Sequence, residues 1–477
     1  MLFNSIDFAI FLPVVFAIYW MLNRNLKLQN IFAVLASYVF YAWWNWQFLG
    51  LLFGMSFLSW GTAWLINKSA IINHQSSISK LWLTASIVLN IGILAVFKYY
   101  NFFVLSFADL FGLQNSIHSL KIVLPLGISF FTFQAISYVV DVYKRKIEPT
   151  NLIDCLLYIG FFPKLLAGPI ERPTNLIPQI QKSRVFDYDL AVDGCRQMLW
   201  GLFKKVVIAD NCASFVNQIY DDYTNQSGST LLLAAIFYTI QIYGDFSGYS
   251  DMAIGTAKLL GFRFRDNFLF PYFSRNMNEF WRRWHISLNT WFVDYVYIPL
   301  GGSREGKWRT IRNTMIIFLL SGLWHGADWS FVAWGAYHGL LLVLLILLNR
   351  NTKYEQVVAY GKFLPSLKEL GQMLFVFLLT TFGWMMFRAD NMTQFVDYTS
   401  RMYSASLFEL PNASGNTILI VNIILMFVLE WFMRNRKHGM DVMLIHSSTI
   451  RYILYGMVFA LILFFGGHTE NFIYMYF

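Results

Sequence analysis

The stretch FVAWGAYHGLLLVLLILL, residues 331–348, is eighteen residues long and carries no formal charge. A helix needs about 20 predominantly apolar residues to cross a bilayer, so this stretch predicts a membrane-spanning helix. The rest of the chain has the same character. Of its 477 residues, 57% are hydrophobic and 13% are charged, whereas a soluble protein carries about 25% charged residues. The sequence therefore predicts an all-α integral membrane protein that crosses the bilayer many times.

Comparable apolar runs occur along the whole chain. They lie near residues 6–22, 30–66, 81–112, 122–143, 152–168, 230–261, 312–325, 370–387, 416–433 and 450–466. Some are long enough to form hairpins or re-entrant segments, so we expect about eleven to thirteen membrane helices. The first run lacks a basic leader and a cleavage site, and we expect it to be kept as a first span. The polar stretches contain neither a linker nor a repeat, which predicts one membrane domain over residues 1–477.

Basic residues are concentrated in a few polar segments. Between residues 262 and 312, nine Lys and Arg residues accompany four Asp and Glu residues. Loops of this kind are held on the cytoplasmic side of a membrane, so we expect residues 262–312, 144–146 and 434–437 to be cytoplasmic. The net charge of +9 then reflects topology and not nucleic-acid binding. Part of it could attract an anionic donor such as a coenzyme thioester.

Aromatic and cationic residues alternate in NEFWRRWHISLNTWFVDYVYIPLGGSR, residues 278–304. Placed on one helix, His285 shares a face with Trp281 and two further apolar residues, whereas the two arginines before it fall elsewhere. We therefore expect His285 to point into the protein or the membrane. The arginines should face water or lipid headgroups. The helical pattern of residues 190–222 is similarly interrupted, at Lys204 and Lys205.

Two histidines, His325 and His338, lie in the apolar stretch SGLWHGADWSFVAWGAYHG, residues 321–339. On one straight helix they would be separated by about 20 Å, which is too far to bind one ion. A turn at residues 326–328 would shorten this distance, but no cluster of His, Cys and Glu accompanies the pair. The three cysteines also lack metal-like spacing. We therefore expect no metal site.

Two kinds of function stay open on the residues alone. Asp245 and Asp251 lie in the apolar segment YGDFSGYSDMAIG, residues 243–255, and such carboxylates often mark an ion or proton pathway. The glycines and serines around them would permit close helix packing or a local break. Alternatively, a neutral histidine in a water-poor cavity can act as the general base for a hydroxyl that attacks a thioester carbonyl. A transporter or channel without chemistry and an acyltransferase are therefore both hypotheses.

Residues 243–304 followed by 321–339 closely resemble the membrane-bound O-acyltransferase family, and within it the bacterial alginate O-acetyltransferase-like branch. D-alanyl transferases of teichoic acid assembly are more distant relatives. Matching pieces are also LPLGISFFTFQAISYVVDVY, FFPKLLAGPIERP, the N-terminal run and the ending FIYMYF, so the resemblance covers essentially the whole chain. It implies a ring of tilted helices around a central tunnel. A cytoplasmic acyl thioester would enter from one side and a hydroxyl acceptor from the other.

The resemblance also implies roles for particular residues. The family's essential histidine lies in a Trp-His-Gly context, which here is His325, and a second functional position upstream matches His285. We expect His325 to act as the general base and His285 to assist by hydrogen bonding or by orienting the donor. His338 is expected to be structural. The further candidates are Arg282, Arg283 and Trp284 for donor binding, Asp245, Asp251 and Trp324 for ordering the tunnel, and Tyr474 as an acyl acceptor that passes the group onward.

The function implied is transfer of an acetyl group from a thioester such as acetyl-CoA, with no permanently bound cofactor. The acceptor would be an extracytoplasmic polysaccharide of the alginate type. The protein would lie in the bacterial inner membrane and work with separate extracytoplasmic O-acetyltransferase proteins. Peptidoglycan, teichoic acid and a lipid are the alternative acceptors.

Overall fold

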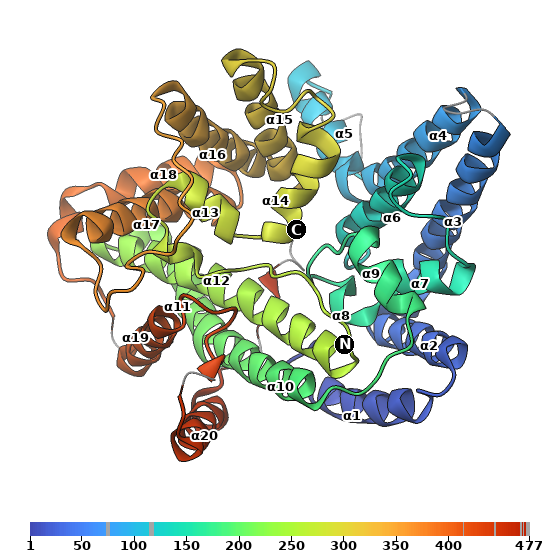
Figure 1. The fold of residues 1–477 in the computed structure, drawn as a ribbon. Helices are drawn as coiled ribbons and strands as arrows, with labels where there is room; N and C mark the ends of the chain where they lie inside the picture. The colour runs from blue at the N-terminus through green and yellow to red at the C-terminus, as the bar shows by residue number, and fades with distance from the viewer. Residues whose placement is uncertain are drawn as a thin grey trace. The chain divides into compact units, whose positions relative to one another are not determined.

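The computed structural model describes residues 1–72, 77–113, 119–413, 415–442, 445–467, 470, 472 and 473 (Figure 1). In these residues the chain is helical and contains no β-strand, which confirms the all-α prediction. The chain divides into two compact units. Unit 1 comprises Met1–Cys195 and Ala253–Arg265, and unit 2 comprises Arg196–Met252 and Asp266–Phe477. The prediction of a single membrane domain stays a prediction.

Unit 1 contains the N-terminal helices. They are α1 (Ile6–Met21), α2 (Leu26–Asn45), α3 (Leu49–Ile72), α4 (Ser77–Leu94), α5 (Tyr100–Phe111), α6 (Ile128–Tyr143), α7 (Leu152–Gly160), α8 (Phe162–Leu165) and α9 (Pro173–Gln181). Helices α3, α4, α6 and α7 pack against one another. A 3₁₀ turn, Trp46–Phe48, separates α2 from α3, so the predicted apolar run at 30–66 is two helical pieces.

Unit 2 contains most of the later helices. They are α10 (Tyr188–Phe203) and α12 (Gly228–Leu259), which both extend into unit 1, and α11 (Asp210–Asp221), α13 (Met277–Arg283), α14 (Ile286–Phe292), α15 (Lys307–His325), α16 (Trp329–Leu347), α17 (Leu367–Arg388), α18 (Met392–Met402), α19 (Thr417–Phe432) and α20 (Ser448–Phe465). Residues 262–312, which looked like a loop between spans, therefore contain two short helices and the start of α15.

Six helical segments of the described residues are long and apolar enough to cross a membrane. They are Leu26–Ser69, Ser77–Phe111, Gly228–Leu259, Trp329–Leu347, Leu367–Arg388 and Ser448–Phe465, and three shorter apolar helices, α1, α6 and α19, accompany them. These are fewer than the eleven to thirteen expected, because several apolar runs fold as short or broken helices. The run at 152–168, for example, forms α7 and α8. The central tunnel stays a prediction.

Small residues let two helices of unit 2 approach closely. A Cβ atom added at Gly201 of α10 would lie 2.5 Å from the carbonyl oxygen of Gly248 in α12. The glycines around Asp245 and Asp251 therefore permit close helix packing, as the sequence indicated. Between α10 and α11 the chain forms a π-helix, Lys204–Ala209. The predicted interruption at Lys204 and Lys205 is thus a change of helical pitch.

Candidate functional site

His285 lies at a break between two helices. Helix α13 ends at Arg283, and His285 itself adopts a left-handed backbone conformation with φ of 45° before α14 begins. The expectation of one continuous helix is therefore wrong. Asn289 stabilises the break, because its side-chain amide donates to the carbonyl oxygens of Trp281 and Trp284 at 2.7 and 2.6 Å. Histidine is among the residues that tolerate this conformation best.

The expected orientation is found for His285 and Arg282 but not for Arg283, whose side chain is 15% exposed and pairs with Glu279. The His285 side chain is buried, with 1% of the residue exposed, whereas Arg282 is exposed. Burial lowers the pKa of His285 well below its usual value, and the neighbouring His325 lowers it further. The imidazole of His285 is therefore held in its neutral form.

His325 is the last residue of α15 and lies in a helical hairpin. Helices α15 and α16 pack against each other along their lengths (Figure 1), and residues 326–328 connect them. Close approach requires glycine here. A Cβ atom at Gly322 would lie 2.2 Å from the carbonyl oxygen of Phe331, and one at Gly335 would lie 2.4 Å from that of Phe318.

The hydrogen bond at Nδ1 indicates the tautomer of His325. Its Nδ1 atom lies 2.6 Å from the backbone carbonyl oxygen of Ser321. A carbonyl oxygen only accepts, so Nδ1 carries the hydrogen of the neutral ring. The lone pair is consequently on Nε2, which is the atom that can accept a proton from a substrate.

The two predicted histidines lie side by side within unit 2. The ring centroids of His285 and His325 are 6.4 Å apart, and 4% of His325 is exposed. Aromatic rings enclose the pair. Phe246, Phe268 and Trp324 contact His285, while Trp324, Trp334 and Phe387 contact His325. This enclosure excludes water. Exclusion of water prevents hydrolysis of a thioester during acyl transfer.

His338 belongs to the same aromatic cluster but faces a different part of it. Its ring lies 5.1 Å from Trp334 and 4.9 Å from Trp281, and Trp334 in turn lies 5.0 Å from His325. Trp334 is thus packed against both histidines of the stretch. Within the described ranges, no group of three or more His, Cys, Asp or Glu residues could hold a metal ion.

Two cavities lie at opposite ends of α16. The first, the Arg282 cavity, has a volume of about 650 Å³ and is lined by Arg282, Asn278, Ser303, Ile346 and Lys353. The second, the Phe387 cavity, has a volume of about 600 Å³ and is lined by Phe387, Phe331, Arg388, Glu470 and Ile473. Trp281 lines the first cavity and Phe387 the second. The histidine cluster therefore lies between the two cavities.

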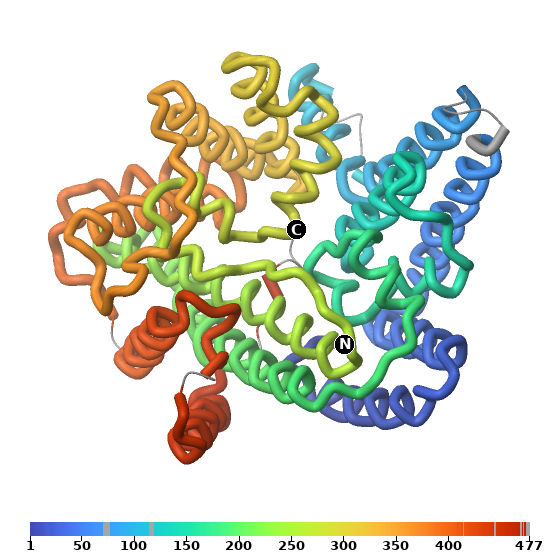
Figure 2. The backbone as a smooth tube through the Cα atoms, viewed as in Figure 1, coloured from blue at the N-terminus to red at the C-terminus, as the bar shows by residue number. Residues whose placement is uncertain are grey.

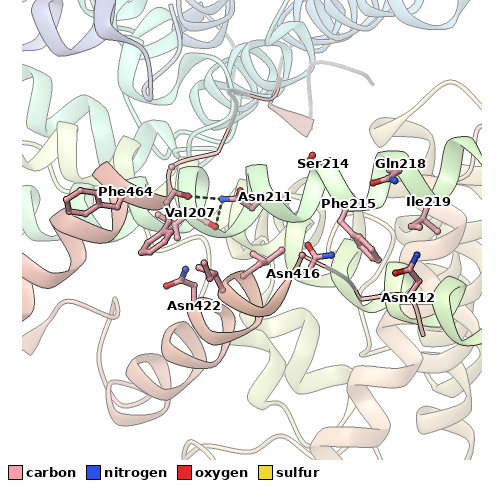
Figure 3. Close-up of a pocket in the computed structure, with 15 residues that line it drawn as sticks. Val207, Asn211, Ser214, Phe215, Gln218, Ile219, Asn412, Asn416, Asn422 and Phe464 are labelled. Atoms are coloured by element: carbon pink, nitrogen blue, oxygen red, sulfur yellow. Dashed lines mark hydrogen bonds between the residues drawn. The ribbon is translucent and has the colours of Figure 1, made fainter. Parts of the chain in front are cut away.

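A third cavity of about 500 Å³ lies between α11, α19 and the end of α20 (Figure 3). Its lining is rich in amides, namely Asn211, Gln218, Asn412, Asn416 and Asn422, and none of its lining residues is charged. The amide of Asn211 is committed to the protein, because it donates to the carbonyl oxygens of Val207 and Phe465 at 2.9 Å each. Amides both donate and accept, so this lining suits an uncharged, hydroxyl-bearing group.

Buried ion pairs hold the two predicted aspartates. Asp251 Oδ2 lies 2.7 Å from Lys204 Nζ, and Asp251 Oδ1 accepts from Gln197 at 2.7 Å. Asp245 Oδ1 lies 3.0 Å from Lys205 Nζ, which also pairs with Asp210 at 2.6 Å. All of these groups are at most 9% exposed. Sequence reasoning missed the lysines as partners, although a Lys-Lys pair inside an apolar helical pattern was a signal.

The remaining predicted site residues do not share one location. Arg283 pairs with Glu279 at 3.0 Å, and Trp284 packs among aromatic rings such as Trp384 at 4.8 Å. Neither lines the Arg282 cavity, so their donor-binding roles stay predictions. The ring of Trp324 packs against both site histidines, tilted relative to His285 at 5.9 Å and edge-on to His325 at 4.9 Å. Tyr474 lies outside the described residues, and its proposed role as an acyl acceptor is likewise untested.

Comparison with known proteins identifies the family. Residues 52–387 match the model of the MBOAT, membrane-bound O-acyltransferase, family. This match covers more than half of the chain and includes both site histidines, so the chain belongs to that family. It is a multi-pass membrane O-acyltransferase, and as such it uses an acyl donor.

Particular relatives are similar over most of the chain. A probable alginate O-acetylase AlgI of Pseudomonas aeruginosa is 38% identical over 449 residues, which are 92% of this chain and 82% of that protein. A peptidoglycan O-acetyltransferase of Helicobacter pylori is 34% identical and covers 82% of this chain and 78% of its own. A teichoic acid D-alanyltransferase of Bacillus subtilis is 30% identical over 50% of this chain and 62% of its own.

Proposed function

We propose that the protein transfers an acetyl group from cytoplasmic acetyl-CoA to a hydroxyl group on the opposite side of the bacterial inner membrane, for O-acetylation of an extracytoplasmic polysaccharide. The observation that carries this proposal is the enclosed pair of His285 and His325, with the lone pair of His325 on Nε2. The relatives that acetylate alginate or peptidoglycan support acetyl as the group and a glycan as the final acceptor.

In this mechanism His325 is the general base. Its Nε2 atom takes the proton of the acceptor hydroxyl as the oxygen attacks the thioester carbonyl. A C–O bond forms, the C–S bond breaks, and the thiolate of coenzyme A leaves with the electron pair of that bond. The proton on His325 then passes to the thiolate, so the base is regenerated and no proton is gained or lost overall. His285, neutral and adjacent, orients the reacting groups.

The charge distribution supports entry of the donor through the Arg282 cavity. The end of the α15–α16 hairpin near this cavity is basic, since Lys307, Arg309 and Arg312 begin α15 and Arg350 and Lys353 follow α16. Such ends face the cytoplasm. Arg282 and Lys353 provide cations for the phosphates of coenzyme A. The acceptor then approaches through the Phe387 cavity.

The immediate acceptor is a hydroxyl of the glycan or of a separate extracytoplasmic transferase protein that completes the reaction. The AlgI-type relatives favour an alginate-like polysaccharide, whereas the Helicobacter relative favours peptidoglycan. In both cases the chemistry at His325 is the same, because each acceptor presents an alcohol.

The test is a His325→Ala variant expressed in cells that lack the native gene. Alkali-labile acetate is measured separately in purified exopolysaccharide and in purified peptidoglycan. Loss of acetate from one polymer, with normal amounts of the variant in the membrane, supports the proposal and names the acceptor. Acetylation of both polymers at the wild-type level would remove the role of His325.

A further inference from the structure

Four described residues that follow α20 pack within unit 2. Past Phe465, the backbone N–H of Gly467 donates to the carbonyl oxygen of Val206 at 2.9 Å. The later residues Phe472 and Ile473 are 3% and 5% exposed, and the last described red piece of the tube lies beside α12 (Figure 2). We call the described residues Gly467, Glu470, Phe472 and Ile473 the C-terminal segment. It is packed inside the unit.

Two charged side chains bind the backbone of the C-terminal segment. Lys205 Nζ donates to the carbonyl oxygen of Glu470 at 3.1 Å, and the backbone N–H of Ile473 donates to Asp245 Oδ2 at 2.7 Å. Lys205 and Asp245 also pair with each other at 3.0 Å. The ion pair thus presents one donor and one acceptor to the segment, and it holds its main chain whatever the side chains are.

The C-terminal segment in turn contacts the surroundings of the site histidines. The ring of Phe472 lies 4.6 Å from Tyr249 and 6.1 Å from Phe246, and Phe246 lies 4.6 Å from His285. Glu470 and Ile473 line the Phe387 cavity, whose Phe387 lies 5.4 Å from His325. The segment therefore forms a wall of the Phe387 cavity, which is the proposed acceptor-side cavity, and it supports His285.

The buried ion pair of Lys205 and Asp245 contributes little to the free energy of folding. Removing charges from water costs several kcal/mol for each ion, and their attraction often only offsets that cost. Lys205 also lies in a π-helical segment, a local irregularity that is frequent at functional sites. Well-packed apolar residues would stabilise the fold equally well. They would not hold the backbone of the C-terminal segment.

We propose that Lys205 and Asp245 are positioning residues, which hold the C-terminal segment as a wall of the acceptor-side cavity so that Phe472 and Phe246 keep His285 in place for acyl transfer. The inference rests on the proposed roles of His285 and His325. It assigns a catalytic contribution to the end of the chain, beyond residues 52–387 that match the family.

The neighbouring Lys204 offers a matched control. It is as buried as Lys205, at 2% against 4% exposure, and it also pairs with an aspartate, Asp251, at 2.7 Å. It also donates to the hydroxyl of Ser247 at 2.8 Å and lies over the ring of Tyr243. These contacts are made to α12 and not to the C-terminal segment. Lys204→Met therefore removes a comparable buried charge without releasing the segment.

The experiment compares Lys205→Met, a chain that ends at Gly467, and the two changes combined, in membrane vesicles supplied with radiolabelled acetyl-CoA. Turnover at saturating donor is normalised to the amount of protein. We expect each single change to lower kcat by about 10-fold or more, as small misplacements do, with an unchanged KM for acetyl-CoA. The combined variant should be no slower than the truncated chain, because Lys205 acts through the segment that is missing.

The truncated chain retains the ion pairs of Lys204 and Lys205 with their aspartates, so it tests the segment even if Lys205→Met folds poorly. Lys204→Met should keep its kcat near the wild-type value. If its kcat falls, combining Lys204→Met with the truncation should multiply the two fold-losses in kcat. Asp245→Asn, which keeps an oxygen to accept the Ile473 N–H, should retain more activity than Asp245→Leu. Multiplying losses for Lys205→Met and truncation, or a truncated chain with wild-type kcat, would overturn the proposal.

Hydrogen–deuterium exchange separates this inference from the proposed function. The Ile473 amide should be protected in the wild-type protein and in His325→Ala, and should lose protection in Lys205→Met and Asp245→Leu. If His325→Ala keeps full transfer, the proposed function fails whatever the segment does. If the amide exchanges equally fast in the wild type and in Lys205→Met, Lys205 does not hold the segment.

Discussion

The imidazole rings of His285 and His325 lie 6.4 Å apart, although His285 stands at the break between α13 and α14, His325 ends α15, and 40 positions separate them in the sequence. Neither helix alone would bring them together. Trp324, which contacts both rings, and the hairpin that carries His325 produce the pairing.

Loss of either site histidine should abolish most transfer. A general base contributes about 10²- to 10⁴-fold to rate, so we expect His325→Ala to lower kcat by at least about 100-fold, and His285→Ala by less. The measurement is acetyl incorporation in membrane vesicles. His338→Phe serves as the control, since His338 lies in the same cluster but packs on Trp281 and Trp334. A His338→Phe variant as inactive as His325→Ala would contradict the assignment.

The neutral state of His285 predicts a pH-dependent stability. Its pKa is lowered by burial and by His325, whereas in the unfolded chain it keeps an ordinary value near 6.5. Below that pH the unfolded state binds a proton at His285 that the folded state does not bind. The free energy of unfolding therefore falls as the pH falls below about 6.5. The loss is at most about 1.4 kcal/mol per pH unit.

The measurement for His285 is the thermal unfolding midpoint in detergent between pH 7.5 and 5.5. The wild-type midpoint should fall more steeply than that of His285→Phe, which has no group to protonate. Parallel pH profiles for the two proteins would show that His285 is not held neutral.

Glycines of the α15–α16 hairpin should resist substitution. Gly322→Ala would place a Cβ atom 2.2 Å from the backbone of Phe331, so the two helices must separate and His325 must move. We expect a lower unfolding temperature and a lower kcat. Gly371→Ala in α17 is the matched control, because a Cβ atom there meets nothing within 4 Å and alanine favours a helix. Equal effects of the two changes would contradict the close packing of the hairpin.

Arg282 should affect donor binding more than chemistry. We expect Arg282→Ala to raise the KM for acetyl-CoA several-fold, by at most about 1 kcal/mol of binding free energy as for an exposed ion pair, with a smaller change in kcat. Lys368→Ala is the control, since Lys368 is an exposed cation at the start of α17 that does not line the cavity. A change in kcat alone, with KM unaltered, would exclude this role.

The class of protein, an all-α membrane protein, and part of the candidate site could be predicted from the amino-acid sequence. Long uncharged runs require a membrane, because a helix satisfies its own backbone hydrogen bonds in lipid. The Trp-His-Gly context of His325 and the aromatic block around His285 marked the two histidines. The span count was less predictable, because an apolar run can fold as one crossing, two short helices or a bent piece, as at 152–168.

What the sequence by itself determined is thus local: which segments are apolar, and which polar groups stand inside them. Tertiary structure alone decided which of those groups meet. The break at His285 depends on the side chain of Asn289 reaching two carbonyl oxygens. The partners of Lys205 come from positions 210, 245 and 470. Such contacts depend on how helices pack in three dimensions. The sequence periodicity of one helix does not indicate which residues of other helices it contacts.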